Sequence, residues 1–260
     1  MIGGNPTLGR LQRMNEGIAV GDHERASYGG IAKKSIFFVL LTFFTAVGTF
    51  LGIVFFLDMD YHFGLILGLL IGAGITSFIM AMVAIFNPNA TKVCGTIYAV
   101  LQGFVLGFTA LMVTMAGFGG EVFAALLATI GVFGIMMVLY ATGVIRVGNG
   151  FRKFIISAVL GMIFVNLILF VVALIGRGTG SMFFWDLFFG NSFLAIGISA
   201  VMVILASLMI LLDLNRMTVI VKAGLDKRYE WVASFGLLIT LIWLYMEFLR
   251  LFIRIASRAR

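Results

Sequence analysis

The sequence has little charge, few histidines, and almost no cysteine or proline. Only 11% of its 260 residues are charged and 62% are hydrophobic, whereas about a quarter of a soluble domain is charged, so the composition excludes an ordinary soluble domain. The single cysteine, Cys94, excludes a disulfide framework and any CxxC site. His23 and His62 lie outside the long apolar stretches, which excludes a haem held by two histidines and an HExxH zinc site within the membrane.

The apolar stretches also lack the residues that several other kinds of site require. None of them contains a lysine that could form a retinal Schiff base, and no GxxxxGKS/T phosphate loop is present. We see no nucleophile–base pair and no cluster of metal ligands. The sequence therefore predicts a protein that is not an enzyme and has no cofactor. The basic residues sit between apolar stretches instead of forming one face, so we expect no nucleic-acid partner.

Seven apolar stretches are each long enough to cross a hydrocarbon core about 30 Å thick, which takes about 20 helical residues. They are too long and too continuous to be strands of a barrel. The sequence therefore predicts an all-α polytopic membrane bundle of seven transmembrane helices. The predicted spans are Ser35–Leu57, Phe63–Phe86, Val93–Met115, Val122–Thr142, Phe154–Ile175, Phe193–Leu214 and Val232–Ile253.

The chain is expected to consist of a cytoplasmic N-terminal tail (1–34), the transmembrane domain (35–254) and a short basic tail (255–260). With the N-terminus inside, thirteen Lys and Arg residues fall in inner segments and one falls in an outer loop, as the positive-inside rule requires. The inner residues are Arg10, Arg13, Arg25, Lys33, Lys34, Lys92, Arg146, Arg152, Lys153, Arg216, Lys222, Lys227 and Arg228, and the outer one is Arg177.

The basic C-terminus does not fit this orientation. Arg254, Arg258 and Arg260 would lie outside if the last segment crosses fully. Either the earlier charges override this short tail, or the last segment is re-entrant and returns inside. We favour a full seventh span.

Three ionisable residues lie inside the apolar stretches: Asp213 in the sixth, and Glu247 and Arg250 in the seventh. A charge at membrane depth is costly, so each is a functional hypothesis by default. If the sixth helix continues past Asn215, Asp213 approaches the depth of Glu247. Two neighbouring carboxylates share a proton because both cannot ionise cheaply. Such a pair can sense pH or bind a hard cation such as Ca²⁺, with Arg250 as counter-ion.

A simpler alternative fits the same residues. Glu247 can pair with Arg250 within its own helix, and Asp213 can lie beside Arg216 at a solvated helix end.

Two polar residues and two glycine rows also lie at membrane depth. Gln102 and Asn166 either line a water-filled path or bond a neighbouring helix, and the second is commoner. Small residues at every fourth position bring helices close together, and packing within one bundle is the favoured interpretation here. These rows are Gly64, Gly68 and Gly72, and Gly103 and Gly107.

Motifs in three segments, Leu208–Asn215, Trp243–Phe252 and Ile97–Gly107, resemble helices of the Bax inhibitor-1 (TMBIM) family. Asn5-Pro6 near the start and the seven spans fit its bacterial Bax-inhibitor-1-like (YccA-type) branch. Leu-Met-Ile-Leu-Leu-Asp-Leu-Asn (Leu208–Asn215) resembles the "YDLN/FDTQ" end of the family's sixth helix. Trp-Leu-Tyr-Met-Glu-Phe-Leu-Arg-Leu-Phe (Trp243–Phe252) resembles its "LYLDFINLF" last helix, and Ile97–Gly107 resembles its "YALLEGLxLG" third helix. The resemblance implies a seven-helix bundle with the last helix central. It also implies a pH-sensitive calcium leak channel gated by a carboxylate pair, which maps to Asp213 and Glu247.

The sequence departs from the family pattern in three places. Glu247 stands where the family has Asp, the connection between the sixth and seventh helices is longer, and the span Phe63–Phe86 lacks the Arg that some members carry. The resemblance also leaves an alternative, a non-conducting regulator that binds other membrane proteins such as a membrane protease. In either case we expect a multi-pass protein of the plasma membrane, the inner membrane in a bacterium, with the lipid bilayer, Ca²⁺ and protons as partners.

Overall fold

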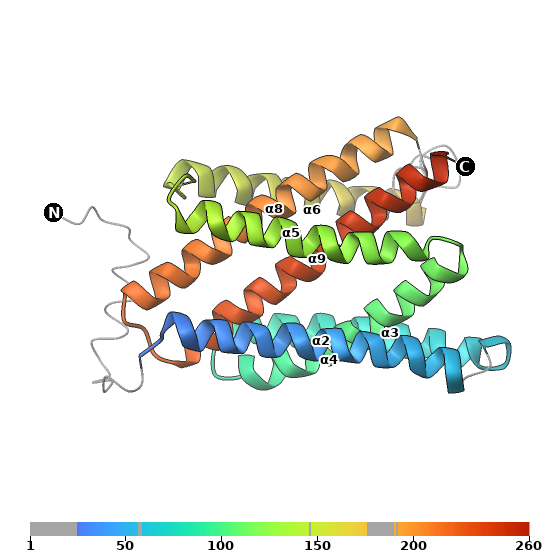
Figure 1. Cartoon of the computed structure of the whole chain (residues 1–260), viewed down its shortest axis with the longest axis horizontal. Helices are drawn as coiled ribbons and strands as arrows, with labels where there is room; N and C mark the ends of the chain where they lie inside the picture. The colour runs from blue at the N-terminus through green and yellow to red at the C-terminus, as the bar shows by residue number, and fades with distance from the viewer. Residues whose placement is uncertain (1–24, 57–58, 146, 176–189, 191, 260) are drawn as a thin grey trace. The chain divides into compact units, whose positions relative to one another are not determined.

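The computed structural model describes residues 25–56, 59–145, 147–175, 190 and 192–259. Within these residues the chain forms seven α-helices and no strand longer than an isolated bridge, which confirms the all-α prediction (Figure 1). The helices are α2 (Tyr28–Phe56), α3 (Met59–Phe86), α4 (Thr91–Met115), α5 (Gly119–Ala141), α6 (Asn149–Ile175), α8 (Phe193–Lys222) and α9 (Arg228–Ala259). Most of the predicted tail and the basic residues Arg10, Arg13, Arg146, Arg177 and Arg260 lie outside the described residues.

The helices begin and end close to the predicted spans, with two informative differences. Helix α2 begins at Tyr28 instead of Ser35, because the Ser27 hydroxyl accepts a hydrogen bond from the Gly30 N–H at 3.0 Å and caps the first turn. Helix α8 continues through Asn215 to Lys222, since the segment Met217–Val221 is apolar and contains no helix breaker.

Six of the described helices are long and apolar enough to cross a membrane: α2, α3, α4, α5, α8 and α9. The remaining predicted span, Phe154–Ile175, corresponds to α6, which is helical over Asn149–Ile175. In the most apolar 18-residue stretch of α9, 56% of the residues are buried, against 11% to 39% in the other five helices. The central position of the last helix stays a prediction. Helix α9 is also one continuous helix, which fits a full span and leaves no re-entrant turn within Arg228–Ala259.

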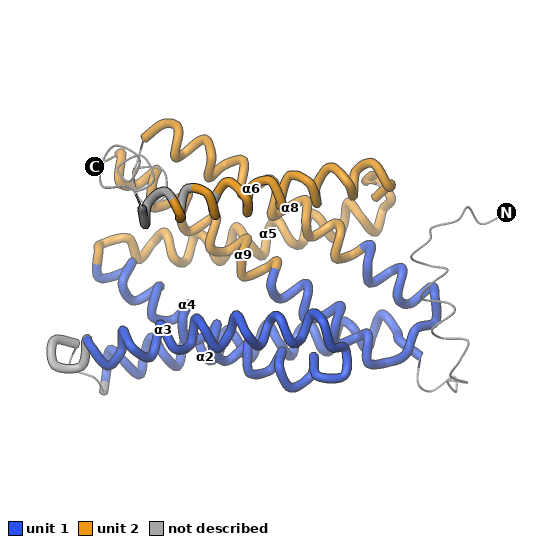
Figure 2. The backbone as a smooth tube through the Cα atoms, turned by 180° about the vertical axis from the view of Figure 1, so that it is seen from behind, with its two compact units in different colours: residues 1–115, 215–239 blue, residues 116–214, 240–260 orange. Residues whose placement is uncertain are grey.

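The chain forms two compact units (Figure 2). Unit 1 contains residues 1–115 and 215–239, and unit 2 contains residues 116–214 and 240–260. Helices α8 and α9 each contribute to both units. The carboxylates Asp213 and Glu247 both belong to unit 2.

The two glycine rows differ in their surroundings. A Cβ on Gly103 would lie 2.6 Å from the Thr42 carbonyl oxygen, and one on Gly107 would overlap the Ala46 carbonyl, so α2 and α4 approach each other at these glycines. Packing within the bundle is therefore confirmed for this row. A Cβ on Gly64, Gly68 or Gly72 would meet no described atom within 4 Å, so the same interpretation is wrong for the row on α3.

Candidate functional site

Asp213 is a buried residue of α8 and bonds to α9. It is 5% exposed, and its Oδ2 accepts a hydrogen bond from the Thr240 hydroxyl at 2.6 Å. Thr240 is itself buried. Because α8 continues beyond Asp213 for more than two turns, the alternative that places Asp213 at a solvated helix end is wrong.

Glu247 is also buried, and it bonds to two residues of its own helix. It is 2% exposed. Its carboxylate accepts hydrogen bonds from Trp243 Nε1 at 3.0 Å and from Arg250 Nη1 at 3.1 and 3.2 Å. The ion pair between Glu247 and Arg250 is therefore local, three residues apart, as the alternative interpretation predicted. The Arg250 side chain is 37% exposed, so this pair is only partly shielded.

Glu247, Arg250 and Arg254 form a charged stripe along one face of α9. Arg254 also contacts α8. It is 4% exposed, and its Nη1 donates to Ser199 Oγ at 2.6 Å and to the Ala195 carbonyl. Ser199 is 1% exposed. The stripe of Glu247 and Arg254 thus faces protein within unit 2, which is where charges in a membrane helix are expected to face.

Thr240 donates a hydrogen bond to Asp213, and Trp243 and Arg250 donate to Glu247. Asp213 bonds to Thr240, and Glu247 follows Thr240 by seven residues, which is about 10 Å along a helix. Sharing of a proton between Asp213 and Glu247 stays a prediction. The arrangement can offer carboxylate oxygens at two levels along α9, on the same helix as Arg250 and Arg254.

The structure shows what Gln102 bonds to, but it does not describe the side chain of Asn166. Gln102 Nε2 donates to Ser77 Oγ at 3.3 Å, joining α4 to α3 within unit 1, so it bonds a neighbouring helix. Asn166 lies in α6, and its side chain is outside the described ones. Among the described residues no three His, Cys, Asp or Glu side chains gather as metal ligands.

Unit 1 contains a buried ion pair that sequence reasoning missed. Glu230 of α9 is 1% exposed and pairs with Lys34 of α2. Its Oε1 also accepts hydrogen bonds from the Ser27 N–H at 2.8 Å and the Ser27 hydroxyl at 3.2 Å. The Lys34 ammonium lies 4.9 Å from the centre of the Trp231 ring. This pair fastens the start of α2 to the start of α9.

The connection between α8 and α9 contacts the residues that directly precede α2. The Ala26 N–H donates to the Leu225 carbonyl at 2.7 Å. Asp226, which lies between the two helices, forms an ion pair with Arg228 at 3.1 Å. Burial acts to raise the pKa of Asp226, but hydrogen bonds from the Arg228 backbone and side chain outweigh it and hold the pKa below its ordinary value. Asp226 is therefore charged at neutral pH.

The helices and the intramembrane carboxylates together define a polytopic helical membrane protein with buried acidic residues. The chain matches the family described as Bax inhibitor 1 like over residues 5–257. It therefore belongs to the Bax inhibitor-1 family, as the resemblance of its sixth and seventh helices predicted. No curated protein and no solved structure matches the chain.

Proposed function

We propose that this protein is a pH-sensitive calcium leak channel of the Bax inhibitor-1 type, and that Asp213 and Glu247 set its pH dependence. One observation carries the proposal: two carboxylates, 5% and 2% exposed, lie within apolar helices of unit 2. An ionisable residue kept at membrane depth is costly and is usually retained for transport or proton sensing. Family membership supports the same function.

Carboxylate and hydroxyl oxygens are the ligands that Ca²⁺ prefers. Asp213 with Thr240 supplies one such group and Glu247 supplies a second, about 10 Å further along α9. Weak sites in succession suit conduction, because an ion must leave each site as readily as it enters. Ca²⁺ is cargo in this proposal.

Protonation changes the charge that each carboxylate presents to its partners. A neutral Glu247 loses its ion pair with Arg250 and keeps at most hydrogen bonds with Trp243 and Arg250. A neutral Asp213 is a weaker acceptor for Thr240. The charged groups beside Glu247 on α9 include Arg250, its ion-pair partner, and Arg254, seven residues further along the helix. Protons thereby shift the balance between closed and open states.

We place the protein in the plasma membrane with the N-terminus on the cytoplasmic side. Basic residues from three predicted inner segments come together in unit 1, around Lys34, Lys92 and Lys227. Such a gathering is expected on the inner face.

The test is Ca²⁺ flux into liposomes that contain only this protein, measured at acidic, neutral and alkaline pH. We expect flux that varies with pH in the wild type and loses that variation in Glu247→Gln and Asp213→Asn. Glu121→Gln is the matched control, since Glu121 lies in the first turn of α5 and not in the stripe. Folded protein that passes no Ca²⁺ at any pH would overturn the proposal and favour a regulatory protein instead. An unchanged pH profile in both variants would remove the two carboxylates from the gate.

A further inference from the structure

A polar pocket of about 420 Å³ lies in unit 1, between the start of α2 and the start of α9. Its size falls in the range of small-ligand sites. The charged side chains that line it are Arg25, Lys33, Lys34, Lys227 and Glu230. Four cations therefore surround one carboxylate, and the pocket favours an anionic ligand.

The carboxylate of the pocket is already engaged. Glu230 pairs with Lys34 and accepts two hydrogen bonds from Ser27, and its 1% exposure leaves little of it facing the pocket. By contrast, Lys33 and Lys227 have exposed side chains. The positive charge that a ligand meets therefore comes mainly from these two lysines.

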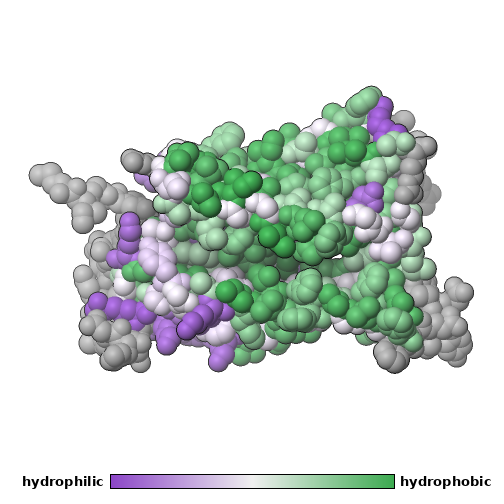
Figure 3. Space-filling model, in the orientation of Figure 1, coloured by the Kyte–Doolittle hydropathy of each residue, from purple (hydrophilic) through white to green (hydrophobic). Residues whose placement is uncertain are grey.

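The pocket adjoins a surface suited to lipid chains. Ile36, Phe37 and Leu40 follow Lys33 on the same face of α2, three, four and seven residues later, and are 58%, 44% and 46% exposed. Figure 3 shows hydrophilic atoms around the start of α2 and hydrophobic atoms over much of its remaining length. A ligand with an anionic head and apolar chains matches both parts.

The aromatic ring of Trp231 marks the boundary between these parts. Lys34 and Lys92 lie 4.9 and 5.7 Å from its ring centre, and Phe37 meets it edge-on at 6.1 Å. Tryptophan with one polar and one apolar side is typical of the membrane–water interface. A pocket beside this ring is therefore expected at the depth of lipid headgroups.

We propose that this pocket binds the phosphate headgroup of an anionic phospholipid, with Lys33 and Lys227 contacting the phosphate and the acyl chains lying on Ile36, Phe37 and Leu40 of α2. Basic residues next to a membrane span are attracted electrostatically to the negative surface of anionic lipids. The pocket adds a defined position for the phosphate. This site is independent of the carboxylates of unit 2, so it stands whether or not the protein conducts Ca²⁺.

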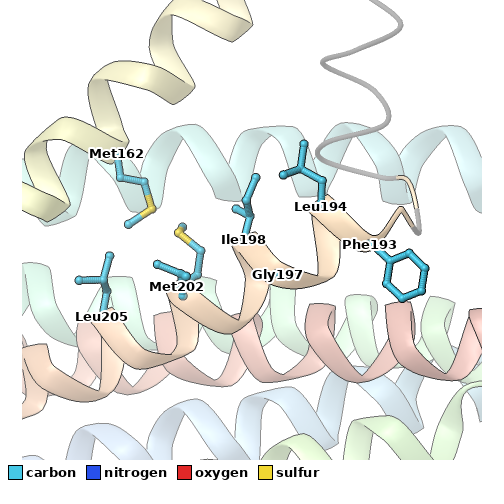
Figure 4. Close-up of a pocket in the computed structure, with 8 residues that line it drawn as sticks. Met162, Phe193, Leu194, Gly197, Ile198, Met202 and Leu205 are labelled. Atoms are coloured by element: carbon cyan, nitrogen blue, oxygen red, sulfur yellow. The ribbon is translucent and has the colours of Figure 1, made fainter.

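A second pocket differs in being wholly apolar. It lies in unit 2, has a volume of about 410 Å³ and is lined by Met162 of α6 and by residues of α8 from Phe193 to Leu205. In Figure 4 the Met162 side chain points toward Met202 and Leu205. Without a charged group to select a headgroup, this pocket offers no basis for lipid specificity.

The test measures binding of a soluble short-chain lipid to the full chain in neutral detergent. Dioctanoyl phosphatidylglycerol is the probe, dioctanoyl phosphatidylcholine tests the headgroup charge, and inorganic phosphate tests a free anion. We expect the phosphatidylglycerol Kd to weaken roughly 25-fold in the double variant Lys33→Gln/Lys227→Gln. Lys33→Gln alone is expected to weaken it about fivefold, which provides a second variant if the double one does not fold.

The matched control removes two cations from unit 2. Arg152 and Lys153 are exposed in α6 and do not line the pocket, so Arg152→Gln/Lys153→Gln is expected to change the Kd by less than about threefold. If the control variant weakens the Kd equally, general charge attraction and not the pocket accounts for the binding, and the proposal is overturned. The proposal would be overturned if the Lys33 and Lys227 variants kept the wild-type Kd for phosphatidylglycerol. It would also be overturned if phosphatidylcholine bound with the same Kd as phosphatidylglycerol. Inorganic phosphate that competes at the same concentration would overturn a lipid as the ligand.

Discussion

Two buried glutamates, one in each unit, are held in different ways. Glu230 of unit 1 bonds to Lys34 and Ser27, which lie 196 and 203 positions away in the sequence. Glu247 of unit 2 bonds to Trp243 and Arg250, four and three positions away in the same helix. Burial is almost equal, at 1% and 2% exposure. Burial alone therefore does not say what a charged residue does.

The difference lies in what each pair connects. The ion pair between Lys34 and Glu230 joins the first described helix to the last, so it connects segments of unit 1 that are far apart in the sequence. The ion pair between Glu247 and Arg250 stays within one helix that would form without it. A buried charge that contributes little to the fold is retained at a cost. This contrast favours a structural role for Glu230 and a functional role for Glu247.

The largest effect is expected from neutralising Glu230. Glu230→Gln should lower the free energy of unfolding by about 3 kcal/mol, because Lys34 is left partly buried without its counter-charge. Glu247→Gln should change it by no more than about 1 kcal/mol, since the pair that it breaks lies within one helix. Reversible unfolding in mixed detergent micelles measures both. Equal losses in the two variants would break the distinction between the glutamates.

A steric test of the same ion pair comes next in size. A Cβ at Gly30 would overlap the Glu230 carboxylate, whereas a Cβ at Gly29 would meet no described atom within 4 Å. Gly30→Ala must displace the carboxylate from Lys34 and Ser27, so we expect a loss of about 2 kcal/mol.

Gly29→Ala is the matched control one residue earlier in the same turn. It is expected to be neutral or to stabilise by up to about 1 kcal/mol, because alanine favours the helix. Thermal unfolding of both variants in one detergent distinguishes them. Similar melting temperatures would mean that the carboxylate moves aside at no cost.

The sequence was sufficient to predict the helices and the two buried carboxylates of unit 2. Long apolar runs define the helices, and a charge inside such a run stands out, which identified Asp213, Glu247 and Arg250. The local pair of Glu247 with Arg250 follows from their spacing of three. The match to the family over residues 5–257 confirms the resemblance seen in the motifs around these residues.

The contacts that a single sequence did not reveal join distant segments. Lys34 and Glu230 fell outside the predicted spans, where charges are common, so neither stood out. Thr240 is one of many hydroxyls in apolar helices, and most of them bond to their own helix. The glycine rows have the same spacing, yet only the row of α4 is packed, because the face that a helix turns to its neighbours depends on the whole bundle.

A smaller effect is expected where a helix-to-helix bond reaches Asp213. Thr240→Val keeps the shape of the side chain and removes the donor at 2.6 Å, so we expect a loss of about 1.5 kcal/mol. Thr129→Val is the control, since the buried Thr129 hydroxyl bonds to the Ala125 carbonyl of its own helix and should lose less than about 0.5 kcal/mol. The free energies of unfolding of the two variants are compared in detergent. Equal losses would show that the hydrogen bond of Thr240 contributes no more than one within a single helix.

The smallest effect is the coupling energy of the local ion pair, and it returns to the two glutamates. In a double-mutant cycle of Glu247→Gln and Arg250→Gln, we expect about 0.5 kcal/mol, because the pair lies within one helix and Arg250 is 37% exposed. The same cycle on Glu230→Gln and Lys34→Gln should give about 2 kcal/mol or more, because this pair is largely shielded from water. Unfolding measurements on the four variants of each cycle give both energies. A coupling at Glu247 as large as that at Glu230 would make it a structural residue too, and the argument for retaining its charge for function would fail.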